Sequence, residues 1–401
     1  MIANIAGGGL MWGLHFLARQ LKEGEYSTFG ALLTVVMVLP TLPLQMVLAQ
    51  QTAKALATGR ERQLAGMIRL VWLGTFLLWL LAAGLVLLQQ ASLLKLLQIN
   101  NPVGLWITLA ACLFALWLPM FSGVLQGQQN FLWLGWAMML NGVGRLTIAA
   151  LAVFALGGYA TGMMSGVMLG LLAGTGIAVW QSSALWRLPS APFDWRPLLA
   201  QVGPLLLGFG AFQVLFTADT LFAKACFTDD QTDAYFGAGT LSRALMWLVG
   251  PLAAVMFPRV VHSAAKAEKS DLMRVVLLGT FVLGAGGALG LCVLGPFVVK
   301  LINYPARYAP QVIALLPWYA WAMVPLALAN VLLNNLLARG SFRVVPSLIV
   351  LALGYTFALT RFHDSPVTVI KVLGSFNLLL LAVSAWFTYR APSAEAQPAV
   401  A

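Results

Sequence analysis

The residues best placed to do chemistry in this chain are ionisable side chains that interrupt long apolar runs. An ionisable group within a bilayer costs about 2.5–3.5 kcal/mol on insertion scales, so each such residue is a candidate functional residue. Arg145 lies near the middle of one apolar run, and Asn141, one helical turn earlier, shares its face. Arg145 and Asn141 either line a substrate cavity or have a structural role, in which Arg145 bonds to backbone carbonyls between helices.

Asp219 and Arg243 are equally distant in sequence from Gln231, at the centre of the acidic loop 229–233. An antiparallel helical hairpin places them at the same depth, where opposite charges should pair or face water. The pair is either a structural bridge or a cavity site in which a substrate phosphate competes with Asp219 for Arg243. Lys224 lies about 140° around the helix from Asp219 and is predicted to face elsewhere.

His15 and Arg19 lie four residues apart in the first apolar run, so an α-helix would place them on one face. Arg19 is either a cavity cation or a side chain that snorkels to the membrane surface. His15 is either structural or a proton-coupling residue, because histidine titrates near neutral pH.

The balance of these groups favours an anionic substrate. Arg145, Arg243, Lys224 and Arg19 together outweigh Asp219, and guanidinium groups bind phosphate oxygens in bidentate fashion. A drug or sodium antiporter needs carboxylates to bind cations, and the first six predicted helices contain none. No Cys-x-x-Cys pair and no Walker A loop occurs, so we expect no metal site, no cofactor, no catalytic residues and no enzyme activity.

Composition predicts the elements that must position these residues. The chain has 401 residues, of which 61% are hydrophobic and 9% charged, against about 25% charged in a soluble domain. Its net charge of +11 comes from cations at the ends of apolar runs, which excludes a nucleic-acid-binding face. Runs long enough to cross a bilayer, about 20 residues each, predict an all-α integral membrane protein. The twelve predicted transmembrane helices are 2–21, 28–50, 66–89, 103–125, 131–156, 159–186, 197–227, 234–258, 274–299, 309–337, 344–360 and 367–389.

Charge distribution predicts the orientation of these helices. With both termini in the cytoplasm, 13 Lys and Arg residues fall in cytoplasmic connections and 7 on the opposite side, as the positive-inside rule requires. The segment Leu17-Ala18-Arg19 with Tyr26 recurs as Phe222-Ala223-Lys224 with Tyr235, which predicts a parallel repeat of two six-helix lobes. The predicted parts are an N-terminal lobe 1–187, a linker 188–197, a C-terminal lobe 198–390 and a disordered tail 391–401. Gly286 and Gly290 are predicted to form a small-residue face for close helix packing.

Several short motifs are spread along the chain: Ala18-Arg19-x-Leu21, Tyr26-x-x-Phe29-Gly30, Gly123-x-x-Gln126-Gly127-x-x-x-Phe131, Asp219 with Lys224, Ala234-Tyr235-x-x-Ala238 and Met256-x-Pro258. Together they resemble the multidrug/oligosaccharidyl-lipid/polysaccharide (MOP) flippase superfamily, and within it the polysaccharide transporter or O-antigen flippase-like branch. The resemblance implies a V-shaped pair of six-helix lobes around a cavity that opens alternately to either side of the membrane. The chain departs from the family in beginning almost directly with its first helix.

The resemblance and the cationic cavity together predict a secondary-type transporter that flips an undecaprenyl-pyrophosphate-linked oligosaccharide or polysaccharide precursor across the inner membrane. Its expected partners are this lipid-linked glycan, membrane lipids and other polysaccharide-assembly proteins such as a polymerase, with no nucleic acid. Two alternatives are a multidrug or cation antiporter of the same fold and a membrane-embedded polysaccharide polymerase or ligase. The polymerase or ligase is disfavoured, because no predicted outer connection exceeds about 13 residues.

Overall fold

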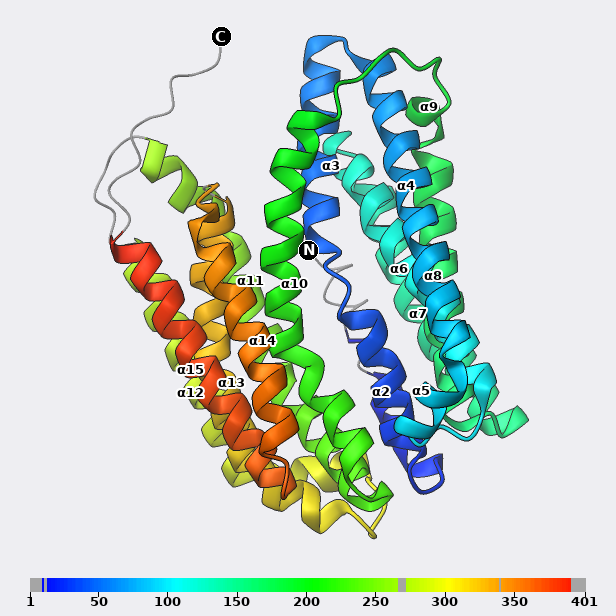
Figure 1. Cartoon of the computed structure of the whole chain (residues 1–401), viewed down its shortest axis with the longest axis vertical. Helices are drawn as coiled ribbons and strands as arrows, with labels where there is room; N and C mark the ends of the chain where they lie inside the picture. Colours follow the sequence, from blue (N-terminus) through cyan, green and yellow to red (C-terminus); the bar gives the residue numbers. More distant parts are fainter. Residues whose placement is uncertain (1–8, 11–12, 266–271, 339, 391–401) are drawn as a thin grey trace. The chain divides into compact units, whose positions relative to one another are not determined.

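The computed structural model describes residues 9–10, 13–265, 272–338 and 340–390, and every regular element among them is a helix (Figure 1). The first set comprises η1 (Leu14–Gln20), α2 (Glu25–Met37), α3 (Leu42–Thr58), α4 (Glu61–Leu88), α5 (Gln90–Leu96), α6 (Pro102–Gly127), α7 (Phe131–Leu156), α8 (Tyr159–Gln181) and α9 (Ser183–Trp186). The second set comprises α10 (Arg196–Cys226), α11 (Asp229–Ala265), α12 (Leu272–Ile302), α13 (Ala309–Ala338), η2 (Phe342–Val344), α14 (Val345–Arg361) and α15 (Pro366–Arg390). The all-α prediction is confirmed for the described residues.

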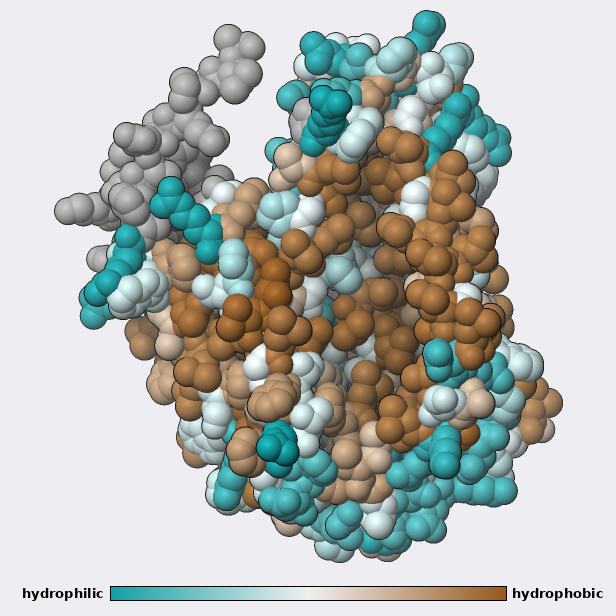
Figure 2. All heavy atoms as spheres, viewed as in Figure 1, coloured by the Kyte–Doolittle hydropathy of each residue, from teal (hydrophilic) through white to brown (hydrophobic). Residues whose placement is uncertain are grey.

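Ten segments in the described residues are long and apolar enough to cross a membrane. Large apolar side chains are exposed along them, such as Leu78 (68%) and Leu81 (63%) on α4, and apolar surface lies between the polar ends of the N-terminal helices (Figure 2). The chain is therefore a multi-span membrane protein. Of the other two predicted spans, 2–21 lies partly outside the described residues and 234–258 lies within α11, whose side chains from residue 250 onward are not described. The count of twelve stays a prediction.

Pro40 explains why the predicted span 28–50 is divided into α2 and α3. Proline has no backbone N–H and cannot continue the helical hydrogen-bond ladder, so the chain leaves the helix after Met37 and re-enters it at Leu42. Gln213 of α10 donates its side-chain N–H to the Met37 carbonyl, which the break exposes. This hydrogen bond therefore links α10 to the end of α2.

Helices α7 and α8 pack closely against each other through glycines of α8. A Cβ atom on Gly166 would lie 2.4 Å from the Arg145 carbonyl oxygen, and one on Gly170 would lie 2.5 Å from that of Asn141. Small residues allow backbones in a membrane to approach this closely. The prediction for Gly286 and Gly290 was wrong, because a Cβ on either would have no described atom within 4 Å.

The α7–α8 contact predicts a measurable difference between two Gly→Ala substitutions on α8. Both gain about 1 kcal/mol of helix propensity, but Gly166→Ala also forces an overpacked contact that costs about 1–3 kcal/mol. A Cβ atom on Gly176 would have no described atom within 4 Å, so Gly176→Ala is the matched control. We expect Gly166→Ala to lower the thermal midpoint of the purified protein and Gly176→Ala to leave it unchanged or raise it. Equal midpoints would show that the packing is looser than described.

The chain divides into two compact units, Met1–Phe236 with Val299–Pro310, and Gly237–Val298 with Gln311–Ala401. This division differs from the lobes predicted on either side of the linker 188–197, because α10 packs on α2 and α3 and so belongs with the first unit. The two six-helix lobes and their parallel repeat stay predictions. The predicted disordered tail 391–401 lies outside the described residues.

Within the first unit, connections that the predicted topology assigns to one side of the membrane are grouped at one end. Glu25 accepts a hydrogen bond from Ala160 N at 2.9 Å, and Gln98 Nε2 lies 3.5 Å from Phe227 O. At the other ends of the helices, Ala191 N donates to Arg62 O at 3.1 Å. The helices therefore alternate in direction as predicted, while the side of the membrane that each end faces stays a prediction.

Cysteine labelling tests the predicted orientation. In a variant without the three native cysteines, we expect Glu23→Cys to react with a membrane-impermeant reagent in intact cells, because the positive-inside rule places residue 23 outside. Gly59→Cys, at the other end of the first unit, should react only after the membrane is permeabilised. Labelling of residue 59 in intact cells as fast as residue 23 would contradict the orientation.

Candidate functional site

A buried carboxylate, Asp233, holds the start of α2. Its Oδ2 accepts a hydrogen bond from Gly24 N at 3.0 Å and its Oδ1 accepts one from Ser27 N at 2.8 Å. The first N–H groups of a helix have no partner within the helix, so a carboxylate placed there satisfies them and complements the helix dipole. Gly24 has a left-handed backbone (φ 73°), which favours glycine at this junction. Segments about two hundred residues apart are thus joined at one carboxylate.

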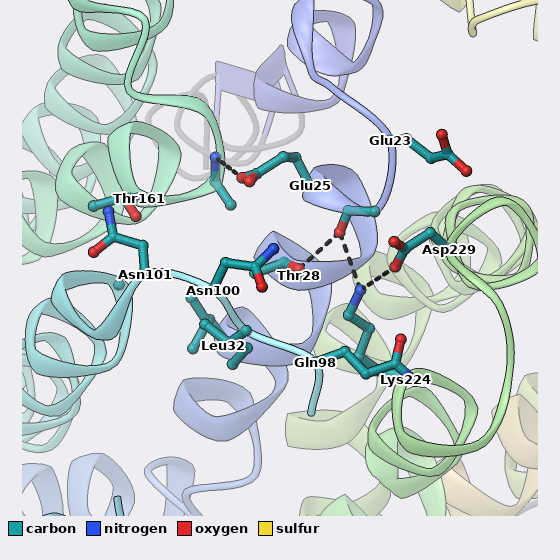
Figure 3. Close-up of a pocket in the computed structure, with 14 residues that line it drawn as sticks. Glu23, Glu25, Thr28, Leu32, Gln98, Asn100, Asn101, Thr161, Lys224 and Asp229 are labelled. Carbon is teal, nitrogen blue, oxygen red and sulfur yellow. Dashed lines mark hydrogen bonds and ion pairs between the residues drawn. The ribbon is translucent and has the colours of Figure 1, made fainter. Parts of the chain in front are cut away.

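Lys224 completes the same junction from the last turn of α10. Its Nζ lies 3.1 Å from Gly24 O and 3.0 Å from Asp229 Oδ1 (Figure 3), and 3.2 Å from Ser27 Oγ. An ammonium group has three hydrogens, so these three acceptors satisfy it completely. The Lys224 side chain is 1% exposed. We name Gly24, Ser27, Lys224, Asp229 and Asp233 the α2 network.

The electrostatics of the α2 network are set by burial and by one further cation. Arg307, in the connection between α12 and α13, places Nη2 3.5 Å from Asp233 Oδ2 and Nε 3.4 Å from Asp230 Oδ1. Asp233 lies just outside the predicted membrane span 234–258. Burial raises the pKa of its carboxyl, while the hydrogen bonds from Ser27 and Gly24 and the charge of Lys224 act in the opposite direction.

A small pocket adjoins the α2 network between α2, the residues before α6 and the start of α8 (Figure 3). Polar side chains that line it include Gln98, Asn100, Asn101 and Thr161. Its cavity volume is about 20 Å³, enough for about one water molecule and far too small for a sugar. The α2 network therefore acts as a junction between segments and offers no binding site for a glycan in this conformation.

A buried chain of hydrogen bonds runs from η1 toward the connection that carries Arg307. His15 Nδ1 lies 2.9 Å from Tyr26 OH, which lies 3.2 Å from Tyr304 OH. The predicted common face of His15 and Arg19 was wrong, because η1 is a 3₁₀ helix with three residues per turn. His15 is consequently buried, whereas Arg19 is exposed.

Arg145 lies about halfway along α7 and is half-buried. Its Nε atom is buried without a hydrogen-bond partner among the described residues, and so is Oδ1 of Asn141. Gly13 approaches Leu146 as η1 packs beside α7, which brings His15 and Arg145 into the same part of the first unit. Three predicted site residues (His15, Asn141 and Arg145) thus lie in one region of the first unit.

Asp219 and Arg243, which were predicted to pair, belong to separate units of the structure. Asp219 is fully buried on α10 and accepts a hydrogen bond from Tyr235 OH at 2.8 Å. The Arg243 guanidinium on α11 lies over the Tyr319 ring, 5.4 Å from its centre. Their pairing and the substrate-binding roles of Arg243, Lys224 and Arg19 stay predictions.

Sequence reasoning missed Ser27, Asp233, Tyr304 and Arg307 as members of a buried polar cluster. The acidic loop 229–233 was recognised only as a marker of the outer side. A usable signal was present, since Asp233 and Ser27 each stand beside the beginning of a helix, where orphan N–H groups need acceptors. Nothing local in the sequence indicates that the acceptor for the N–H groups of α2 comes from α11.

No protein-family model and no curated protein sequence matches the chain, but solved structures do. An inward-facing multidrug-resistance MATE family transporter of the MOP superfamily is similar with a TM-score of 0.75 at 13% identity, covering 96% of this chain and 93% of that one. The lipid II flippase MurJ in an inward closed conformation is similar with a TM-score of 0.70 at 12% identity, covering 96% and 85%. A mutant of the Vibrio cholerae MATE transporter VcmN is similar with a TM-score of 0.55 at 16% identity, covering 96% of both chains.

These similarities extend over nearly the whole chain and include both drug transporters and a lipid flippase, so they do not select a branch. The chain therefore has the fold of the MOP superfamily of membrane transporters.

Proposed function

We propose that this chain is a secondary-type transporter that flips an undecaprenyl-pyrophosphate-linked oligosaccharide or polysaccharide precursor to the outer leaflet of the inner membrane. The observation that carries the proposal is Arg145, a cation midway along a membrane-spanning helix whose buried Nε has no described hydrogen-bond partner. A cation at this depth is energetically costly, so its presence indicates a functional role. A guanidinium group is suited to binding phosphate oxygens. Asn141, one turn away, offers an amide to the same anionic group.

The positions of the acidic residues argue against the alternative of a multidrug or cation antiporter. In residues 13–187, the three acids are Glu23 in a connection and Glu25 and Glu61 at the first positions of α2 and α4. Glu25 is already bonded to the start of α8. A cation substrate would therefore find no carboxylate in the middle of these helices.

The α2 network fits a transport cycle of alternating access between two six-helix lobes. It joins residues 24–27 to residues 224–233, which lie on opposite sides of the predicted linker 188–197. In the proposed cycle the junction holds one end of the transporter closed, and its bonds break when that end opens. In this cycle Lys224 and Arg243 become available to the pyrophosphate in states that release them from their present contacts, whereas Arg19 is already exposed.

The alternative of a membrane-embedded polymerase or ligase has less support. Such an enzyme needs an outer segment large enough to carry catalytic residues. The connection between α12 and α13 is only residues 303–308, and Tyr304, Arg307 and Tyr308 in it are engaged in packing or ion pairing.

A deletion strain tests the proposal. Without the transporter, we expect the lipid-linked glycan to accumulate with its sugar facing the cytoplasm, because synthesis continues while export stops. Complementation by the intact chain should clear it. No accumulation in the deletion strain, together with increased sensitivity to cationic drugs, would favour the antiporter instead.

A further inference from the structure

A groove lies between α13 and α15 in the second unit, and none of the candidate site residues lines it. Its cavity volume is about 200 Å³, and Trp318, Trp321, Lys371 and Gly374 are among its lining residues. The two helices are held together at its floor. Asn377 Nδ2 donates to Ala322 O at 2.8 Å, and a Cβ on Gly374 would lie 3.4 Å from the Ala322 Cβ.

The rim of the groove consists of apolar side chains that face outward from membrane-spanning helices. Trp318 is 51% exposed, Trp321 43% and Leu378 57%. Apolar surface at this depth contacts hydrocarbon, not water. An apolar cavity of about 150 Å³ is large enough to bind benzene, so this groove is large enough for a section of an acyl chain.

A cation stands at one end of the groove. Lys371, in the second turn of α15, is exposed, and its Nζ lies over the Trp318 ring, 5.1 Å from the ring centre. No hydrogen bond joins this ammonium group to an acceptor in the described residues, so its donors are available. Tryptophan and lysine near a helix end mark the headgroup level of a bilayer, where phosphate groups lie.

We propose that the α13–α15 groove binds an anionic phospholipid, with one acyl chain between Trp321 and Gly374 and the phosphate paired with Lys371. Charge selects the headgroup, because a cation near the membrane surface attracts anionic lipids. The groove fixes the position of the lipid, because the acyl chain fills space that is otherwise empty between two helices. The assignment does not depend on the proposed transport function.

The test is native mass spectrometry of the purified full chain with phosphatidylglycerol or phosphatidylcholine of identical acyl chains. Lys371→Gln removes the proposed phosphate partner, and Lys300→Gln removes an equal charge from another exposed lysine at a helix end. We expect wild type and Lys300→Gln to retain phosphatidylglycerol preferentially. Lys371→Gln should bind it about five-fold more weakly, which corresponds to about 1 kcal/mol per cation near a membrane surface, and should bind phosphatidylcholine as wild type does.

Gly374→Leu tests the acyl-chain part by filling the groove, and it should reduce retention of both lipids. Equal effects of Lys371→Gln and Lys300→Gln would overturn the headgroup assignment, as would preferential retention of a polyprenyl phosphate over phosphatidylglycerol. Unchanged lipid retention by a Gly374→Leu protein with wild-type thermal stability would overturn the groove. If Gly374→Leu does not fold, Trp321→Ala, which removes one wall, should lower retention of both lipids, and unchanged retention would contradict the proposal.

Discussion

Arg145→Ala is expected to reduce glycan export about tenfold or more. A guanidinium group that binds pyrophosphate contributes charge-assisted hydrogen bonds of about 1.5–3 kcal/mol, and about 1.4 kcal/mol corresponds to a factor of ten. Arg145→Lys should restore export in part, because the charge is kept while the bidentate geometry is lost. The measurement is the rate at which lipid-linked glycan becomes accessible outside cells that express each variant at equal levels.

The matched control is Arg274→Ala, at an exposed position near the start of α12, which should leave the export rate unchanged. Arg243→Ala should behave as Arg145→Ala does if both cations line the cavity. Since Arg243→Ala can also destabilise the protein by depriving Asp219 of its predicted partner, Asp219→Asn/Arg243→Ala should regain stability without regaining export. Wild-type export by well-expressed Arg145→Ala and Arg243→Ala proteins would exclude a cationic cavity.

Asp233→Ala is expected to cause the largest loss of stability among substitutions in the α2 network. It removes the acceptor of two backbone N–H groups and one of the two carboxylates that pair with Arg307. Each buried donor left without an acceptor costs about 1–3 kcal/mol. Asp233→Asn, which keeps one acceptor oxygen, should have a smaller effect. The measurement is the thermal unfolding midpoint of each purified variant in the same detergent, which should fall from wild type through Asp233→Asn to Asp233→Ala.

Asp230→Ala is the control for this loss, because Asp230 lies three residues earlier and contacts the same Arg307. Its side chain is 37% exposed, and an exposed ion pair contributes only about 0.2–1 kcal/mol. We expect its thermal midpoint to stay close to that of the wild type. Similar midpoints for Asp233→Ala and Asp230→Ala would mean that the buried carboxylate does not hold the start of α2.

The long helices could be predicted closely from the sequence, because an apolar run that spans a bilayer can form only a helix there. The predicted spans 103–125 and 309–337 correspond to α6 (Pro102–Gly127) and α13 (Ala309–Ala338). The glycine-lined contact could not be located in the same way. Glycine recurs at four-residue intervals both on α8 (Gly162, Gly166, Gly170 and Gly174) and on α12 (Gly286 and Gly290), but only the structure shows that α7 lies against the first set.

The candidate site was predictable only in part. Arg145 and Asn141 were found because a polar group inside an apolar run is conspicuous and one helical turn fixes their relation. The prediction that His15 and Arg19 share a face was wrong, because helix propensity does not distinguish a 3₁₀ helix from an α-helix over seven residues. The bond between Ser27 and Asp233 spans 206 residues, so it depends on tertiary packing that no local pattern encodes.

Reconstitution into liposomes tests the central claim most directly, that the chain flips an anionic lipid-linked glycan. The purified protein is incorporated with a fluorescent pyrophosphate-linked oligosaccharide lipid, and its movement between leaflets is followed by quenching from outside. A parallel arm measures uptake of a fluorescent cationic drug. We predict that wild-type protein flips the glycolipid, that Arg145→Ala flips it about tenfold more slowly, and that neither protein transports the drug. Transport of the cationic drug without flipping of the glycolipid would contradict the account.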